Sequence, residues 1–293
     1  TIVDVLESKR RVLIVADAPH PDVAAIKNAA QSNKHQEVNV LWASELNEKD
    51  SIPQYDIMIL HNLPNPQHPL PDAVGKAIAK DVPMLFFGGA SVDWKQLPAE
   101  RTGFTYEISD LSESVGVDLN NEFSLFSVGE KLEAKLAFLP PLNSVLGKVE
   151  AKNSLDILLY KKLGTLETTW PLWAFNKDAS GRKSGVVLGD GVWRWRIESF
   201  IRAGNFETFD HLINNSIKYL SSREDVRRFR IEASNTLFED ERVKFKAQVY
   251  DASLNPTTDV DIELTLTDKN GKTFSFYFTP ENENYILNCG RLS

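Results

Sequence analysis

The chain has 293 residues and a net charge of −8, and its lysines and arginines are scattered along the sequence. This distribution excludes a nucleic-acid surface, which needs a basic stripe, and the single cysteine, Cys289, excludes an intrachain disulfide and a cysteine-based metal site. The length predicts two domains, and no apolar run reaches the ~20 residues that span a bilayer.

Strands and helices alternate through the first ninety residues. Apolar runs predict strands at 11–17, 37–43, 55–64 and 82–87, and helical spacing of apolar residues predicts helices at 22–32 and 70–81. Such alternation indicates parallel strands joined by right-handed crossovers. We therefore expect an α/β domain with a flavodoxin-like, doubly wound, mostly parallel sheet.

The middle of the chain has shorter segments. Lys161, Lys162 and Gly164 follow the apolar run LDILLY and precede TTWPLWAFN, which predicts a hairpin and an antiparallel extension of the sheet. The run KSGVVLGDG, residues 183–191, then returns to the pattern of a buried strand that ends in a glycine-flanked turn. Helices are expected to follow, from Val192 and over 207–222.

The last part of the chain changes to alternation of apolar and polar residues, and Asp268 to Gly271 forms a strong hairpin-turn signal. Half-exposed antiparallel strands without helices predict an immunoglobulin-like β-sandwich. The segment has room for fewer than the usual seven strands, so we expect a partial, truncated sandwich. The predicted domains are 1–225 and 226–293, with a linker at 221–228.

In a parallel sheet of this order, ligands bind outside the carboxyl ends of the strands. The polar residues and glycines expected there form a candidate binding crevice. They are Asp17, His20, His61, Asn62, Gly89, Ser91 and Asp190.

The turn after the fourth strand resembles a nucleophile elbow, in which a strand turns sharply into a helix. Residues 89–93 match the motif G-x-S-x-G except that Asp93 replaces the last glycine. A hydrolase would use Ser91, but the triad histidine should follow the serine. His68 precedes it, and His211 lies in a predicted helix.

His20 and His61 are expected at neighbouring strand ends. With Asp17 they could form a site of two histidines and one carboxylate for a metal. Histidines in proline-flanked loops more often cap or bond the backbone, so the favoured reading has no metal and no cofactor.

The stretch GDGVWRWRIESF is the most unusual in the chain. Helical spacing places Trp193, Ile197, Phe200 and Ile201 on one face, which we expect in the core, and Trp195 on another, which we expect to pack against a neighbouring domain. Arg194 and Arg196 either draw an anion to the helix start or stack and pair at the surface. These three residues, Arg194, Trp195 and Arg196, are the predicted interaction site.

The strand and turn VPMLFFGGAS, the turn at Pro140 to Leu142 and the motif GDGVWRWR together resemble the class I glutamine amidotransferase-like domain of large bacterial envelope proteins. The resemblance covers most of residues 10–290. It implies a membrane-anchored parent protein of which this is a soluble fragment, a location on the periplasmic or extracellular side, and protein or envelope partners.

A working member of that family has a cysteine in the elbow and a histidine after a late strand. Here Ala90 takes the position of the cysteine, and Gly189, Asp190 and Gly191 include no histidine. The resemblance therefore implies a non-catalytic pseudo-amidotransferase scaffold that contacts proteins or an envelope polymer. The alternative is a hydrolase that uses Ser91 or a metal at His20 and His61.

Overall fold

A computed structural model describes residues 9–46, 52, 55–80, 82–128, 138–151, 155–222, 229–233, 242–250, 256–267, 271–281 and 284–291. The chain divides into two compact units, Ser8–Ser222 and a smaller unit formed by Thr1–Glu7 and Arg223–Ser293. Within the described ranges, no helix has the length and apolar character needed to cross a membrane.

Half of the large sheet is parallel. Its strands lie in the order β2-β1-β3-β4-β9. Their bounds are β1 Arg10–Ala16, β2 Gln36–Trp42, β3 Ile57–His61, β4 Met84–Phe87 and β9 Lys183–Val187. Strands β3, β4 and β9 are buried along their whole length, as expected for strands covered on both faces. The expected α/β class is confirmed, but the sheet is parallel over only half of its strands, where a mostly parallel sheet was expected.

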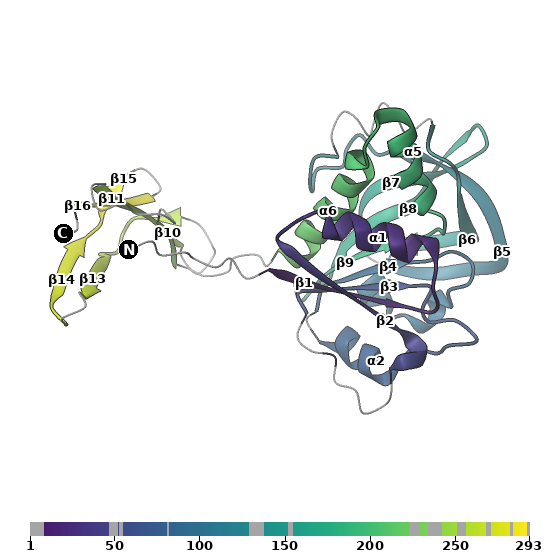
Figure 1. The fold of residues 1–293 in the computed structure, drawn as a ribbon, viewed down its shortest axis with the longest axis horizontal. Helices are drawn as coiled ribbons and strands as arrows, with labels where there is room; N and C mark the ends of the chain where they lie inside the picture. The colour runs from purple at the N-terminus through teal and green to yellow at the C-terminus, as the bar shows by residue number, and fades with distance from the viewer. Residues whose placement is uncertain are drawn as a thin grey trace. The chain divides into compact units, whose positions relative to one another are not determined.

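Helices cover both faces of this half (Figure 1). Val12 and Ile14 of β1 share a core with α1 (Pro21–Gln31) and α6 (Glu207–Ser221). Leu13 and Val15 point the other way and share a second core with α2 (Asp72–Ala79). The alternation of side chains along a strand thus separates two apolar layers.

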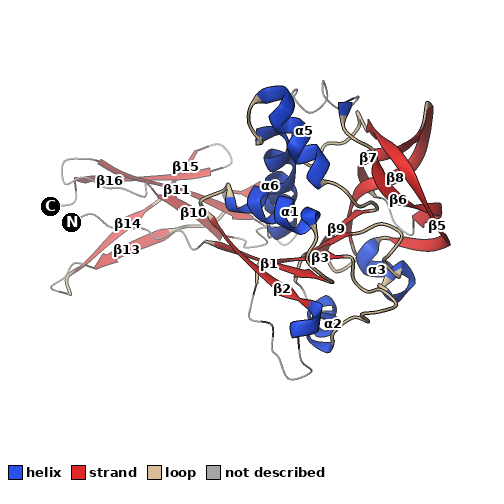
Figure 2. Cartoon of the chain, turned by 45° about the vertical axis from the view of Figure 1, so that its right-hand side comes forward, coloured by secondary structure: helices blue, strands red, loops and turns tan. Residues whose placement is uncertain are grey.

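The other half of the sheet is antiparallel, as expected, and continues from β9 in the order β8-β7-β5-β6 (Figure 2). The bounds are β5 Phe104–Leu119, β6 Leu142–Ala151, β7 Asp156–Leu163 and β8 Leu166–Lys177. The β7–β8 turn contains Gly164 at φ 60°, a conformation that favours glycine. Lys161 and Lys162, expected in the turn, lie within β7.

The antiparallel half curls back to the end of β9. Asn143, near the start of β6, exchanges two backbone hydrogen bonds with Asp190, with N–O distances of 3.0 and 2.8 Å. Next to it, the hydroxyl of Ser144 donates to the carbonyl oxygen of Leu188. Together these bonds tie the start of β6 to the backbone at Leu188 and Asp190.

The nucleophile elbow predicted after β4 is wrong. Its turn continues into a 3-10 helix, η2 (Trp94–Gln96), and the four-residue helix α3 (Ala99–Thr102), so the long helix of an elbow does not follow. Gly88 and Gly89 instead allow neighbouring side chains to pack directly against the backbone of the turn. A Cβ on Gly88 would lie 2.2 Å from Cγ2 of Val92.

The smaller unit is all-β. Its five-stranded sheet contains β10 Phe229–Ala233, β11 Arg242–Tyr250, β12 Pro256–Thr257, β15 Thr279–Glu281 and β16 Asn284–Arg291. A separate antiparallel pair joins β13 Glu263–Thr267 and β14 Thr273–Tyr277. Ala247, Phe278, Tyr285 and Leu287 form its core. Residues 223–228 of the expected linker and 268–270 of the expected turn lie outside the described residues.

Lys161 is a buried charge in the antiparallel half. Its side chain is 1% exposed, and its ammonium donates to the carbonyl oxygen of Val145 at 3.0 Å. Burial lowers the pKa of Lys161 from 10.5 to about 8, because removal from water disfavours the charged form.

Replacing this lysine by an apolar side chain of similar length is expected to stabilise the protein. A lowering from 10.5 to about 8 corresponds to about 3 kcal/mol, of which about 1 kcal/mol is offset by the lost hydrogen bond. Lys161→Met should therefore raise the free energy of unfolding at pH 7 by about 1–3 kcal/mol, measured by urea denaturation.

The gain depends on pH. The folded pKa of Lys161 lies below the unfolded one, so the full cost of burying the charge is present below about pH 8. Above that pH the folded lysine loses its proton and the cost falls, and it is gone near pH 10.5, where the unfolded lysine loses its proton too. Lys162→Met, on the neighbouring and partly exposed residue, is the control and should change stability little. A Lys161→Met variant less stable than the wild type at pH 7 would contradict this account.

Candidate functional site

The carboxyl ends of β1 and β3 bring two histidines together. His61 is the last residue of β3 and is paired in register with Ala16 of β1. His20 follows β1 and is the N-cap of α1. Their ring centroids are 4.9 Å apart. Adjacent parallel strands therefore place both rings at one edge of the sheet.

The carboxylate beside these rings is that of Asp22, in the first turn of α1. Its side chain is 1% exposed and accepts hydrogen bonds from the backbone N–H groups of Gly191 at 2.7 Å and Trp193 at 2.8 Å. Burial alone would raise the pKa of Asp22, but the contact with His61 and these two bonds outweigh it and hold the pKa below 3.8. Asp22 is therefore ionised at neutral pH.

The predicted grouping of Asp17 with the histidines is wrong. The carboxylate of Asp17 pairs with the ring of His68, and Asp22 takes its place. The Asp22 Oδ2 atom lies 3.6 Å from His20 Nδ1 and 3.6 Å from His61 Nε2. One ligand atom from each of His20, Asp22 and His61 lies within 4.8 Å of the others, which is compatible with a metal ion.

Asp190 and Asn62 lie on the same edge. Burial raises the pKa of Asp190, with Asp22 adding repulsion and His61 and His20 opposing the shift. The Oδ1 atoms of Asp190 and Asn62 are buried and have no hydrogen-bond partner among the described residues. Gly89 leaves room for the carboxylate, since a Cβ there would lie 2.4 Å from Asp190 Oδ2.

Ser91 is exposed and is not joined to this cluster by any hydrogen bond among the described residues. His68 is engaged by Asp17, and His61 faces Asp22. The described geometry thus gives the Ser91 hydroxyl no histidine base. Ala90 beside it offers only a methyl group.

The faces predicted for α5 (Trp193–Ala203) are inverted. Trp195, expected to pack against a neighbouring domain, lies in the core of the larger unit: it is 1% exposed, and its indole N–H donates to the carbonyl oxygen of Pro140 at 2.7 Å. Ile197, Phe200 and Ile201, expected in the core, are exposed. Trp193 is partly buried.

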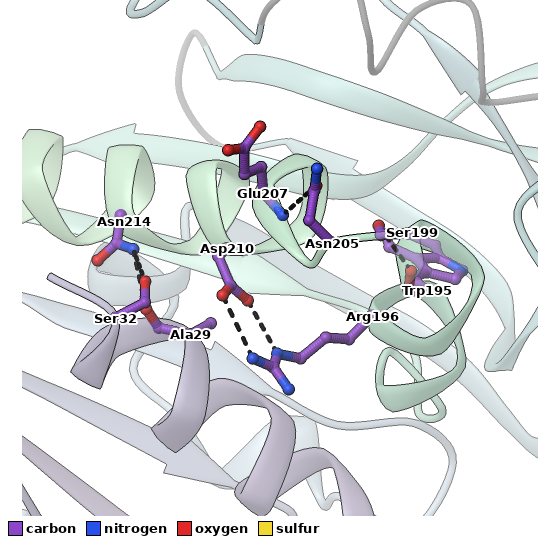
Figure 3. Close-up of polar contacts among 9 residues, drawn as sticks. All are labelled: Ala29, Ser32, Trp195, Arg196, Ser199, Asn205, Glu207, Asp210 and Asn214. Atoms are coloured by element: carbon purple, nitrogen blue, oxygen red, sulfur yellow. Dashed lines mark hydrogen bonds and ion pairs between the residues drawn. The ribbon is translucent and has the colours of Figure 1, made fainter. Parts of the chain in front are cut away.

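The two arginines of this stretch make protein contacts. Arg196 pairs with Asp210 of α6 at 2.8 Å (Figure 3). Arg194 donates from Nη2 to the carbonyl oxygen of Pro141 at 2.6 Å. Both side chains therefore fasten α5 to its neighbours.

Sequence reasoning missed Asp22 and Asn143. An acidic residue in the first turn of a helix is common, because it favours the helix dipole, so Asp22 looked ordinary. Its actual partners, Gly191 and Trp193, lie about 170 positions further along the chain. The one sequence signal was the pair of glycines at 189 and 191, because glycines let a distant side chain approach the backbone closely.

Neither the comparison with protein-family models nor that with curated proteins gives a match. Among solved structures, the chain is similar to the "mmIFT52 N-terminal domain", with 13% sequence identity, a TM-score of 0.43, and coverage of 73% of this chain and 98% of that chain.

These findings correct two expectations. The resemblance to class I glutamine amidotransferase-like domains is wrong: no family model matches, and the strand-turn-helix elbow is not formed. The location on a bacterial envelope rested on that resemblance alone and is withdrawn with it.

Removing the charge of Asp22 is expected to destabilise the protein in a pH-dependent manner. Asp22→Asn replaces a charged acceptor of two backbone N–H groups by an amide whose NH₂ must face one of them. We expect a loss of about 2–4 kcal/mol at pH 7. Denaturant unfolding in chelator-treated buffer measures it.

Because the folded pKa of Asp22 is below its ordinary value, the stabilisation is complete above about pH 4 and is lost as the pH falls through the folded pKa. The difference between wild type and Asp22→Asn should therefore shrink in acid. Asp17→Asn, at the same edge but partly exposed, is the control. A difference that is the same at pH 7 and pH 3 would refute the role of the charge.

Proposed function

We propose that this chain is a non-catalytic binding module that contacts a partner protein through the outer face of α5. The observation that supports this proposal is the exposed apolar surface of that helix. Ile197, Phe200 and Ile201 are 46%, 50% and 69% exposed. Clustered large apolar side chains at a surface are typical of a protein-binding site.

The buried side of α5 explains why these residues stay outside. Trp195 and Ser199 are buried, and Trp195 and Arg196 are held by Pro140 and Asp210. A rotation of the helix that buried Ile201 would break both contacts. The apolar residues are thus presented by a helix whose orientation is fixed, which lowers the entropy cost of binding.

Two further aromatic contacts extend the surface. Phe138 is 53% exposed and lies under the guanidinium of Arg202, which is 3.9 Å from its ring centroid. Phe200 stacks on Phe206 with centroids 5.0 Å apart. Together with Ile197 and Ile201 these residues form what we call the α5 surface. Rigid aromatic side chains of this kind carry much of the energy of protein interfaces.

The charge of α5 indicates the chemistry of the partner. Of the three arginines of the helix, Arg196 is paired with Asp210 and Arg202 with Glu198, so the α5 surface carries little unpaired charge. A partner with an apolar face of its own, rather than a strongly charged one, fits this surface.

We also infer the finer fold assignments. The strand order β2-β1-β3-β4-β9 supports a flavodoxin-like parallel half. The antiparallel pairs of the smaller unit support an immunoglobulin-like sandwich.

The test uses chemical cross-linking of the full chain in extracts of its native cells, followed by purification of any protein cross-linked to α5 and titration calorimetry. The double variant Ile197→Asp, Ile201→Asp should weaken the affinity for that partner by about 100-fold, as expected for loss of central apolar anchors. The affinity should change little with added salt, because the contact is mainly apolar.

Leu166→Asp is the matched control, because Leu166 is also apolar and 62% exposed but lies at the β7–β8 turn. It should leave the affinity unchanged. Cross-links that map away from α5, or equal affinity of the double variant and wild type, would reject the proposal.

A further inference from the structure

The cluster of His20, Asp22 and His61 has the donor set of a transition-metal site. One ligand atom from each residue lies within 4.8 Å of the others. Asp22 Oδ2 is equally distant, at 3.6 Å, from a ring nitrogen of each histidine. These separations are too long for hydrogen bonds, but they are near the span that one ion bridges with ligands at ~2.0–2.2 Å.

His61 gives independent evidence that a ligand belongs here. Its side chain is 1% exposed, and neither ring nitrogen has a hydrogen-bond partner among the described residues. A buried polar group without a partner is costly. Without its proton, the ring nitrogen that faces Asp22 would offer an electron pair at the centre of the cluster, and an ion bound there would satisfy it.

The other unsatisfied atoms at this edge are acceptors as well. Oδ1 of Asn62 and Oδ1 of Asp190 are buried without partners among the described residues, and the carboxylate of Asp190 interacts electrostatically with both histidines. An occupant that suits such a set accepts electron pairs and carries positive charge. A divalent cation with bound water meets both requirements.

Asp22 is already held in place for such a role. The backbone N–H groups of Gly191 and Trp193 fix both of its oxygens, which is how ligating carboxylates are oriented in metal sites. His61 is fixed at the end of a buried strand. Two of the three ligands are therefore positioned before an ion arrives.

His20 is the adjustable ligand. Its Nδ1 accepts the backbone N–H of Asp22 at 3.1 Å, and its side chain is 34% exposed. Binding through Nδ1 takes the electron pair used in that bond, and binding through Nε2 puts the proton on Nδ1. Either way the N-cap bond is exchanged for the metal bond, so His20 contributes less affinity than His61.

We propose that His20, Asp22 and His61 bind one divalent transition-metal ion of the Zn²⁺, Co²⁺ or Ni²⁺ class. Two imidazoles and one carboxylate suit these ions, whereas Mg²⁺ and Ca²⁺ prefer oxygen ligands alone. A water on the bound ion would find acceptors in the partnerless Oδ1 atoms of Asp190 and Asn62 at the same edge. None of the three ligands belongs to the α5 surface.

The test titrates the full chain, prepared without a histidine tag and stripped with chelator, with Co²⁺ and Zn²⁺. Calorimetry should give one equivalent, and Co²⁺ should show a visible absorption band that Zn²⁺ removes. His61→Ala should weaken Zn²⁺ binding by about 100-fold or more, at least as much as loss of a ligand's hydrogen-bond partner does. His20→Ala should weaken it less.

His68→Ala is the matched control, because His68 lies at the same edge but is paired with Asp17. It should bind Zn²⁺ as the wild type does. Zn²⁺ should also raise the melting temperature of the wild type and of His68→Ala but not of His61→Ala. If His61→Ala does not fold, Zn²⁺ titration of His20→Ala is the deciding measurement, because His20 is partly exposed and its substitution disturbs the core less.

Less than half an equivalent of bound Co²⁺ would overturn the proposal. So would binding that survives both the His20 and the His61 substitutions, binding that is lost in His68→Ala, or displacement of the bound ion by equimolar Mg²⁺.

Discussion

The carboxylate of Asp22 is the contact on which the arrangement of the carboxyl edge depends. It sits in the first turn of α1 and bonds the backbone that leads from β9 into α5. A buried charge is tolerated there because two N–H groups and a helix start compensate it. Without this tie, the turn after β9 would have no partner for two backbone donors, and the position of α5 would be set only by packing.

The same contact at the start of α5 bears on both proposals. The inner face, with Trp195, closes the core against the segment that contains Pro140, and the outer face presents Ile201 to solvent. One carboxylate therefore orients an apolar surface on one side and holds a ligand position beside His61 on the other. Substitutions of His61 and of Ile201 should remove the two proposed activities separately, whereas loss of Asp22 should affect both.

The sequence predicted the parallel half of the fold well, because strands covered on both faces are apolar throughout and differ clearly from the intervening helices. The prediction of the buried face of α5 was wrong. Trp193 and Trp195 are both large and apolar, so helical spacing alone does not tell which of them points into the core. The sequence predicted that His20 and His61 lie near each other, since neighbouring strand ends share an edge. It could not find Asp22 or Asn143 as partners of residues 189–193, because such long-range contacts leave no periodic pattern.

The pairing of β4 with β9 has a consequence for the order in which the protein assembles. Met84 lies opposite Ser184, so closing this parallel pair in an unfolded chain costs about 4 kcal/mol of loop entropy for ~100 residues. The hairpin of β7 and β8 is local and sits within that interval. Forming it first shortens the effective loop, so local antiparallel pairing should precede the central parallel pairing. The strand that completes the middle of the sheet is then among the last to dock, and the carboxyl edge becomes organised only at that late stage of folding.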